Sequence, residues 1–128
     1  MMEAFLVPDK TVVNAKGDGP ALDVGQAEGR VFLLTLAITN IVEQESLDVA
    51  IYASADGAAW DAKPVAAFPQ KFYCGTYQIL LDLREHPEIR HVRAKYQAQR
   101  WGKGDPKPLF GAYLFAQEVQ QQVLSMTA

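Results

Sequence analysis

Apolar and polar side chains alternate with a period of two along most of this chain, and this alternation predicts β-strands. In residues 47–54 every second side chain is apolar, starting from Leu47. Asp56 and Gly57 then end the strand, because glycine adopts positive φ freely and aspartate tolerates it. Trp60 follows as a large apolar side chain that can fold back over this turn.

Further segments show the same strand pattern. Residues 76–84 alternate, and in residues 89–101 the face opposite the apolar side chains is polar, so we expect that face to lie in solvent. Shorter segments predict additional strands at residues 3–7, 10–15 and 21–24, with an edge strand around residues 65–68. Pro8 is expected to stop the first of these strands.

Two segments, residues 30–42 and 109–119, are apolar on both faces. A sandwich strand covers the core with one face only, so the second face needs a terminal segment, a loop or a second subunit to cover it. A helix is the competing interpretation of residues 30–42. The β-branched side chains Thr35, Ile38 and Val42 disfavour it.

The number of strands then indicates the fold. About eight strands with no strong helix predict an all-β protein, an antiparallel two-sheet β-sandwich that is most simply a jelly roll. The length of 128 residues fits a single domain over residues 1–128.

One motif resembles that of a known family. The residues that carry it are Ser54, Asp56, Gly57 and Trp60 after a strand, Tyr77 before a second strand, and residues 91–93 at the start of a third. Over residues 47–101 this pattern resembles discoidin-type (coagulation factor 5/8 C-terminal type) galactose-binding-like jelly rolls. The resemblance implies a domain that binds glycans, lipids or protein surfaces, or that forms a structural part of a larger assembly such as a phage particle.

Composition excludes several classes of protein. A net charge of −3 disfavours a sequence-independent nucleic-acid binder, which needs a basic stripe. Cys74 is the single cysteine, so the disulfide usual in the discoidin-type family cannot form, and we expect a small buried apolar side chain there. The longest apolar block, residues 31–42, is too short to span a membrane. The start of the chain lacks a signal peptide, so we expect a cytoplasmic protein, within a particle or free.

Catalytic signatures are missing from the sequence. His86 and His91 are too few for a zinc site, and no Gly-x-Ser-x-Gly, P-loop or His-Glu-x-x-His motif occurs. Asp18 and Asp23 lie near glycine-rich turns and could contribute to a calcium site, although a plain turn is the simpler interpretation. We therefore expect no enzyme, no metal and no cofactor.

The first functional hypothesis is assembly. The two strands that are apolar on both faces carry more apolar surface than one core uses, and such surface usually marks an interface. The hypothesis is a non-enzymatic subunit that self-associates into a homo-oligomer or a larger, phage- or capsid-like particle. The predicted interface residues are Phe32, Leu33, Leu36, Phe110, Leu114 and Phe115.

The alternative hypothesis is a discoidin-like carbohydrate-binding module, whose partner would be a glycan. Such a site needs exposed aromatic platforms beside planar polar side chains. The candidates are Trp60, Tyr73, Arg100 and Trp101, with Asp61 nearby. For Trp60, packing in the core beneath its turn is the competing interpretation.

Overall fold

The computed structural model describes residues 3–13, 16–25, 27, 29–41, 45–71, 73–100 and 110–119, with the backbone alone at residues 10, 12, 41, 45, 99 and 100. These residues form nine strands and no helix. The strands are β1 (Glu3–Val13), β2 (Lys16–Asp18), β3 (Leu22–Asp23), β4 (Val31–Ile41), β5 (Glu45–Ser54), β6 (Ala66–Ala67), β7 (Gly75–Asp82), β8 (His91–Arg100) and β9 (Phe110–Glu118).

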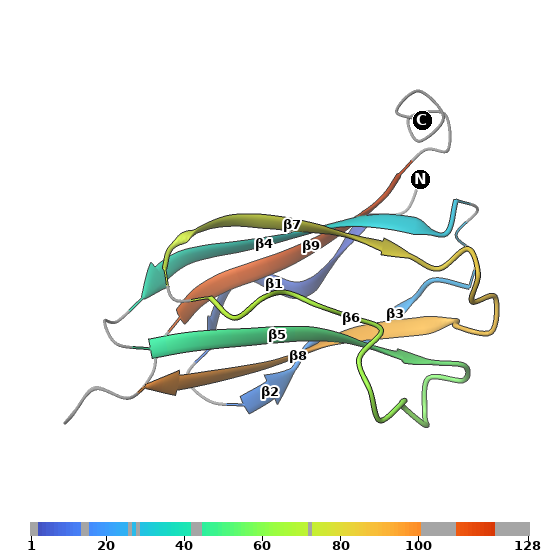
Figure 1. Cartoon of the computed structure of the whole chain (residues 1–128), viewed down its shortest axis with the longest axis horizontal. Coiled ribbons are helices and arrows are strands. Elements are labelled where there is room, and N and C mark those ends of the chain that lie inside the picture. The colour runs from blue at the N-terminus through green and yellow to red at the C-terminus, as the bar shows by residue number, and fades with distance from the viewer. Residues whose placement is uncertain are drawn as a thin grey trace.

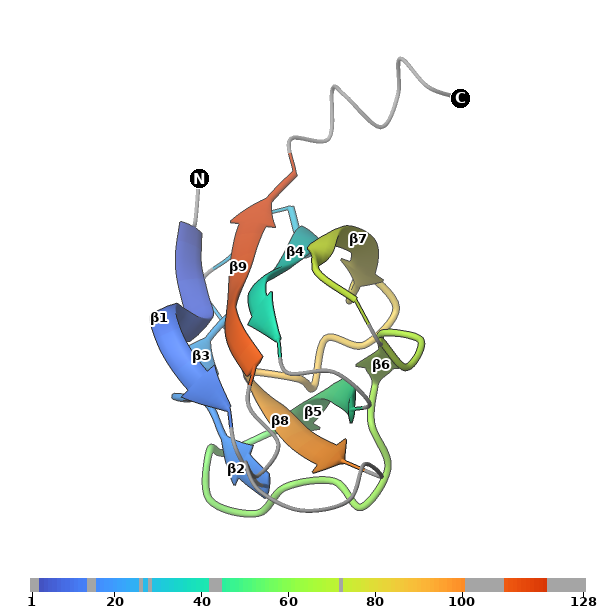
Figure 2. The ribbon, with the colours of Figure 1, turned by 90° about the vertical axis from the view of Figure 1, so that its left-hand side faces the viewer.

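The strands build two antiparallel sheets that face each other as a sandwich (Figures 1 and 2). One sheet has four strands in the order β1-β9-β4-β7. The other has five, in the order β2-β8-β5-β6, with β3 also paired to β8. The expected all-β, two-sheet sandwich is confirmed.

The pairing of the strands is nested. β1 pairs with β9, β2 and β3 pair with β8, β4 pairs with β7, and β5 pairs with β6. When β2 and β3 are counted as one interrupted strand, the first strand pairs with the last, the second with the second to last, and so on inward. An eight-stranded, two-sheet arrangement of this kind is a jelly roll.

One predicted boundary is wrong. The sequence suggests two strands separated at Pro8, whereas β1 continues through this residue. The pairing of β1 with β9 shifts register between Phe5 and Val7 and again between Val7 and Thr11. The Thr11 hydroxyl donates a hydrogen bond of 2.6 Å to the carbonyl of Pro8 within this irregular stretch. An edge strand tolerates proline because the missing N–H need not serve a second neighbour.

The core lies between the sheets and takes every second residue of the central strands. Phe32, Leu34 and Leu36 of β4 are at most 1% exposed. Phe110 and Leu114 of β9 are fully buried. Four predicted interface residues therefore lie in the core, namely Phe32, Leu36, Phe110 and Leu114. Only the other two, Leu33 and Phe115, point away from it, because they occupy the opposite parity of their strands.

Arg30 ties the loops at one end of the sandwich. Its guanidinium donates hydrogen bonds to the carbonyls of Val24, His86 and Ile89, at 3.2, 2.6 and 3.0 Å. Its φ is 60°, a conformation that costs a residue with a side chain about 1 kcal/mol. The three bonds to separate loop carbonyls hold it there.

The core assignment makes a testable prediction. Leu36→Ala should lower the free energy of unfolding by about 2–5 kcal/mol, because it leaves a cavity between the sheets. Lys63→Ala is the control, since Lys63 is exposed in the connection between β5 and β6, away from the core and from the four-stranded sheet, and its loss should cost at most about 0.5 kcal/mol. Urea denaturation of both variants measures the difference. Equal costs would contradict the placement of β4.

Candidate functional site

On the outer face of the four-stranded sheet, most of the described side chains that the register assigns are uncharged. Antiparallel pairs share a face, so the register identifies its members. The described side chains on it are Phe5, Leu33, Thr35, Ala37, Thr76, Gln78, Leu80, Tyr113, Phe115 and Gln117. We refer to these residues as the uncharged face. The charged side chains Glu3 and Asp82 lie at one end of it.

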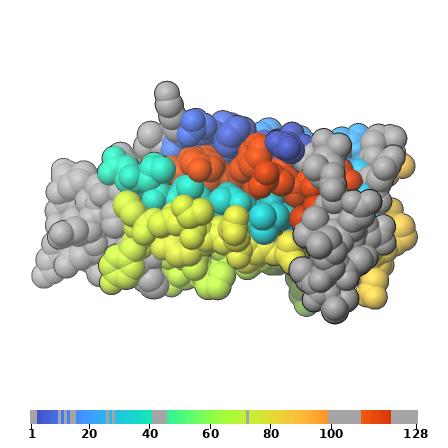
Figure 3. Space-filling view, turned by 90° about the horizontal axis from the view of Figure 1, so that it is seen from above, coloured from blue at the N-terminus to red at the C-terminus, as the bar shows by residue number. Residues whose placement is uncertain are grey.

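Aromatic side chains gather on the uncharged face along β1 and β9. The Phe5 ring lies 4.8 Å from the Phe115 ring and 5.9 Å from the Tyr113 ring, centroid to centroid. Phe5 is nevertheless 42% exposed. Leu80, opposite Leu33 across the β4–β7 pair, is more exposed still. Figure 3 views this face directly, with β1, β9, β4 and β7 side by side across it.

The outer face of the five-stranded sheet has the opposite character. The charged side chains that the register places on it are Lys16 and Asp18 of β2, Asp23 of β3, Asp48 of β5, and Arg93 and Lys95 of β8. We refer to these residues as the charged face. Tyr52 and Trp60 pack among them. The Arg93 guanidinium lies 4.4 Å from the Trp60 ring, and the Lys95 ammonium lies 4.7 Å from the Tyr52 ring.

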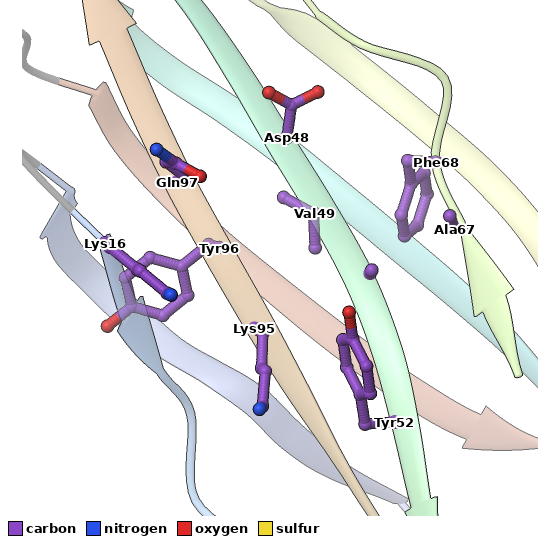
Figure 4. A pocket seen from close by; sticks show the side chains of 10 residues that line it. Lys16, Asp48, Val49, Tyr52, Ala67, Phe68, Lys95, Tyr96 and Gln97 are labelled. Carbon is purple, nitrogen blue, oxygen red and sulfur yellow. The ribbon is translucent and has the colours of Figure 1, made fainter. Parts of the chain in front are cut away.

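A hollow of about 400 Å³ opens on the charged face over β5 and β8 (Figure 4). It is lined by Lys16, Asp48, Val49, Ala50, Tyr52, Ala67, Phe68, Lys95, Tyr96 and Gln97. Ala50 pairs with Ala67 on one side and with Lys95 on the other. Two adjacent methyl side chains surrounded by long ones leave the space that forms the hollow.

The turn that follows β5 is built around Ser54. Its buried hydroxyl donates to the Ala59 carbonyl at 2.6 Å and accepts from the Gly57 N–H at 2.8 Å. Gly57 has φ of 82°, as the Asp-Gly prediction requires. Asp56 accepts hydrogen bonds from the N–H groups of Ala59 and Ala58 and from the Ser54 hydroxyl, and these bonds hold the pKa of its carboxyl below the ordinary 3.8.

The predicted glycan-binding residues do not gather in one place. Trp60 is half-buried, with the Arg93 guanidinium over its ring. Tyr73 is 73% exposed. The segments that carry them bond to opposite ends of β5, since the Asp61 N–H reaches the Ala53 carbonyl while Lys71 bonds to Leu47. The side chain of Arg100 and all of Trp101 lie outside the described residues.

The structure also bears on Cys74 and on the two aspartates considered for a calcium site. The expectation that Cys74 is buried is wrong, because it is exposed just before β7. Asp18 faces Arg93 at 3.8 Å, and the Asp23 carboxylate accepts the Gly25 N–H at 2.8 Å, so both serve protein contacts. Among the described residues, no three His, Cys, Asp or Glu side chains lie close enough together to hold a metal ion.

Sequence reasoning missed part of both outer faces. Leu80 interrupts the polar side of residues 76–84, which is the one local signal for an apolar outer surface on β7. Phe5 and Tyr113 could be assigned to this surface only with the β1–β9 register known. In the sequence, Lys95 and Tyr52 are ordinary strand positions, because the hollow that they line depends on the distant Ala67.

Comparisons with protein-family models, with curated proteins and with solved structures find no match to this chain. The resemblance to discoidin-type domains therefore stays a prediction. In the described part of the chain, no helix has the length and apolarity needed to cross a bilayer.

The acidic groups predict how stability depends on pH. Hydrogen bonds from Arg84 hold the pKa of Asp82 at about 2, and that of Asp56 is also lowered. A lowered folded-state pKa stabilises the fold above the unfolded-state value, and this stabilisation is lost as pH falls through the folded-state value. The free energy of unfolding should therefore decrease between about pH 4 and about pH 2.

Asp56→Asn should reduce this acid sensitivity. The variant should have a lower free energy of unfolding than the original protein at neutral pH. The difference between the two free energies should become smaller as the pH falls from about 4 to about 2. Denaturant titrations at a series of pH values measure both curves. A gap that stays constant from neutral to acidic pH would contradict the role of the ionised Asp56 carboxylate.

Proposed function

We propose that this protein is a non-enzymatic jelly-roll subunit that associates with itself through the uncharged face into a homo-oligomer or a larger particle. The observation that carries the proposal is a sheet face with aromatic side chains on two strands, where the described residues assigned by the register carry charge at one end only. The absence of catalytic motifs from the sequence keeps the proposal non-enzymatic.

The contrast between the two outer faces supports this reading. A sheet face in solvent is normally polar, and the charged face follows that rule. The centres of protein interfaces are instead depleted of charge and enriched in aromatic side chains. Phe5 and Leu80, both exposed, have the chemistry of such a centre.

A second copy of the chain is the partner that this face favours. The rings of Phe5, Tyr113 and Phe115 stand along β1 and β9, and the aliphatic side chains of Leu33 and Leu80 stand along β4 and β7. A two-fold contact requires a surface that complements itself, and rings of one copy that pack against the aliphatic side chains of the other meet that requirement in both directions. An uncharged surface also needs no partner of opposite charge.

Paired charges on this face should prevent assembly. In the double variant Phe5→Lys, Leu80→Lys, each contact between copies would bury unpaired ammonium groups, which costs several kcal/mol. We expect light scattering with size exclusion to show an oligomer for the original chain and a monomer for this variant. A negatively stained grid of the original peak would show whether the oligomer is a closed ring or shell.

A control variant carries two added lysines outside the uncharged face. Ala58→Lys, Ala62→Lys places two lysines at exposed loop positions and should leave the oligomer intact. Circular dichroism and the melting temperature verify that both variants are folded. A monomeric original chain at high concentration, or a folded Phe5→Lys, Leu80→Lys variant that keeps its mass, would overturn the proposal.

A further inference from the structure

The hollow on the charged face has an apolar floor. The methyl groups of Ala50 and Ala67 lie side by side in register, and the Phe68 ring, itself 5% exposed, borders them. Tyr52 does not add a free aromatic platform, because the Lys95 ammonium lies 4.7 Å from its ring. A ligand would therefore place a small apolar surface against two methyl groups.

Polar groups surround this floor. Asp48 and Gln97, which pair across β5 and β8, stand at one end of the hollow, and Tyr52 and Lys95 stand at the other (Figure 4). Lys16 of β2, which pairs with Gln97, adds a further ammonium group at the β8 side. Side chains that can form hydrogen bonds therefore lie at both ends of one shallow site.

The charge of the lining favours an anion. Lys16 and Lys95 supply two ammonium groups against the one carboxylate of Asp48. That carboxylate already accepts a hydrogen bond from the Gln70 side-chain amide at 3.2 Å. Beside the lining, Asp18 pairs with Lys95 in register but also faces the Arg93 guanidinium at 3.8 Å, so the surroundings of the hollow stay positive in a chain whose net charge is −3. A ligand that brings a carboxylate would pair with the ammonium groups of Lys16 and Lys95.

We infer that this hollow binds an acidic sugar, a pyranose ring that carries a carboxylate. Such a ring has an apolar C–H side for the alanine floor, hydroxyls for Asp48 and Gln97, and an anion for Lys95 and Lys16. A volume of about 400 Å³ is at the small end for ligand sites and fits one or two sugar rings. This inference does not rest on self-association, because it uses the other sheet.

A matched series of ligands tests the inference. Glucuronate has both the sugar ring and the carboxylate, glucose has only the ring, and acetate has only the carboxylate. Titrations followed by amide NMR chemical shifts report the affinity of each compound and the residues that it contacts. We expect glucuronate alone to saturate at millimolar concentrations, with the largest shifts at Ala50, Lys95 and Gln97. Equal binding of all three, or shifts elsewhere on the chain, would overturn the inference.

Two variants probe the site itself. Lys95→Gln should weaken glucuronate binding by about tenfold through loss of the charged hydrogen bond. Ala50→Val should abolish saturation by filling the floor, and valine suits a strand. Lys63→Gln, at an exposed loop position, removes the same charge and should bind as the original chain does. If Lys63→Gln and Lys95→Gln weakened glucuronate binding equally, the loss would come from the net charge of the protein, and the proposed binding site would be overturned.

Two further measurements complete the test. A hyaluronan tetrasaccharide carries glucuronate within a chain; tighter binding than to the free sugar would identify a polysaccharide as the source, and weaker binding would identify the free sugar acid. The Phe5→Lys, Leu80→Lys variant should bind glucuronate unchanged, whatever its mass. Loss of binding there, with the fold intact, would overturn the independence of the two faces.

Discussion

The register of β4 between its two neighbours is the constraint on which the rest of the structure depends. Leu36 pairs with Leu114 on one side and Tyr77 on the other, and this pairing sends Leu36 and Leu114 into the core. The next residue pair, Ala37 and Tyr113, then points outward. A slip of one residue would exchange the two sets and expose the core. Both the core and the uncharged face follow from this one alignment.

The two sheets use their outer faces for different chemistry. Lys95 and Asp48 surround a floor of alanines on one side, while Phe5 and Phe115 gather on the other. If both proposals hold, association would bury one sheet and leave the ligand hollow of the other open on the outside of the assembly. The sandwich would then separate contact between subunits from recognition of a ligand by the thickness of its core.

Sequence periodicity predicted the strands but not which of two apolar faces turns inward. In residues 30–42 and 109–119 both parities are apolar, so Phe32 and Leu33 look equivalent until the partner strands are known. The structure separates them, because β4 and β9 pair with each other over one shared core. The hollow was beyond reach for a similar reason, since its floor joins Ala50 to Ala67 across a long connection.

The nested pairing also governs when the chain can fold. Phe5 of the first strand can pair with Phe115 only after all of the intervening chain has been synthesised. Contacts between such distant residues form slowly, because the entropy of closing the loop is lost before the contact stabilises anything. During synthesis β4 is made before both of its neighbours, β7 and β9, and its apolar side chains stay uncovered on both faces until those strands follow. The outward apolar side chains of β4, which belong to the uncharged face, would then also need to be shielded by a chaperone on the nascent chain.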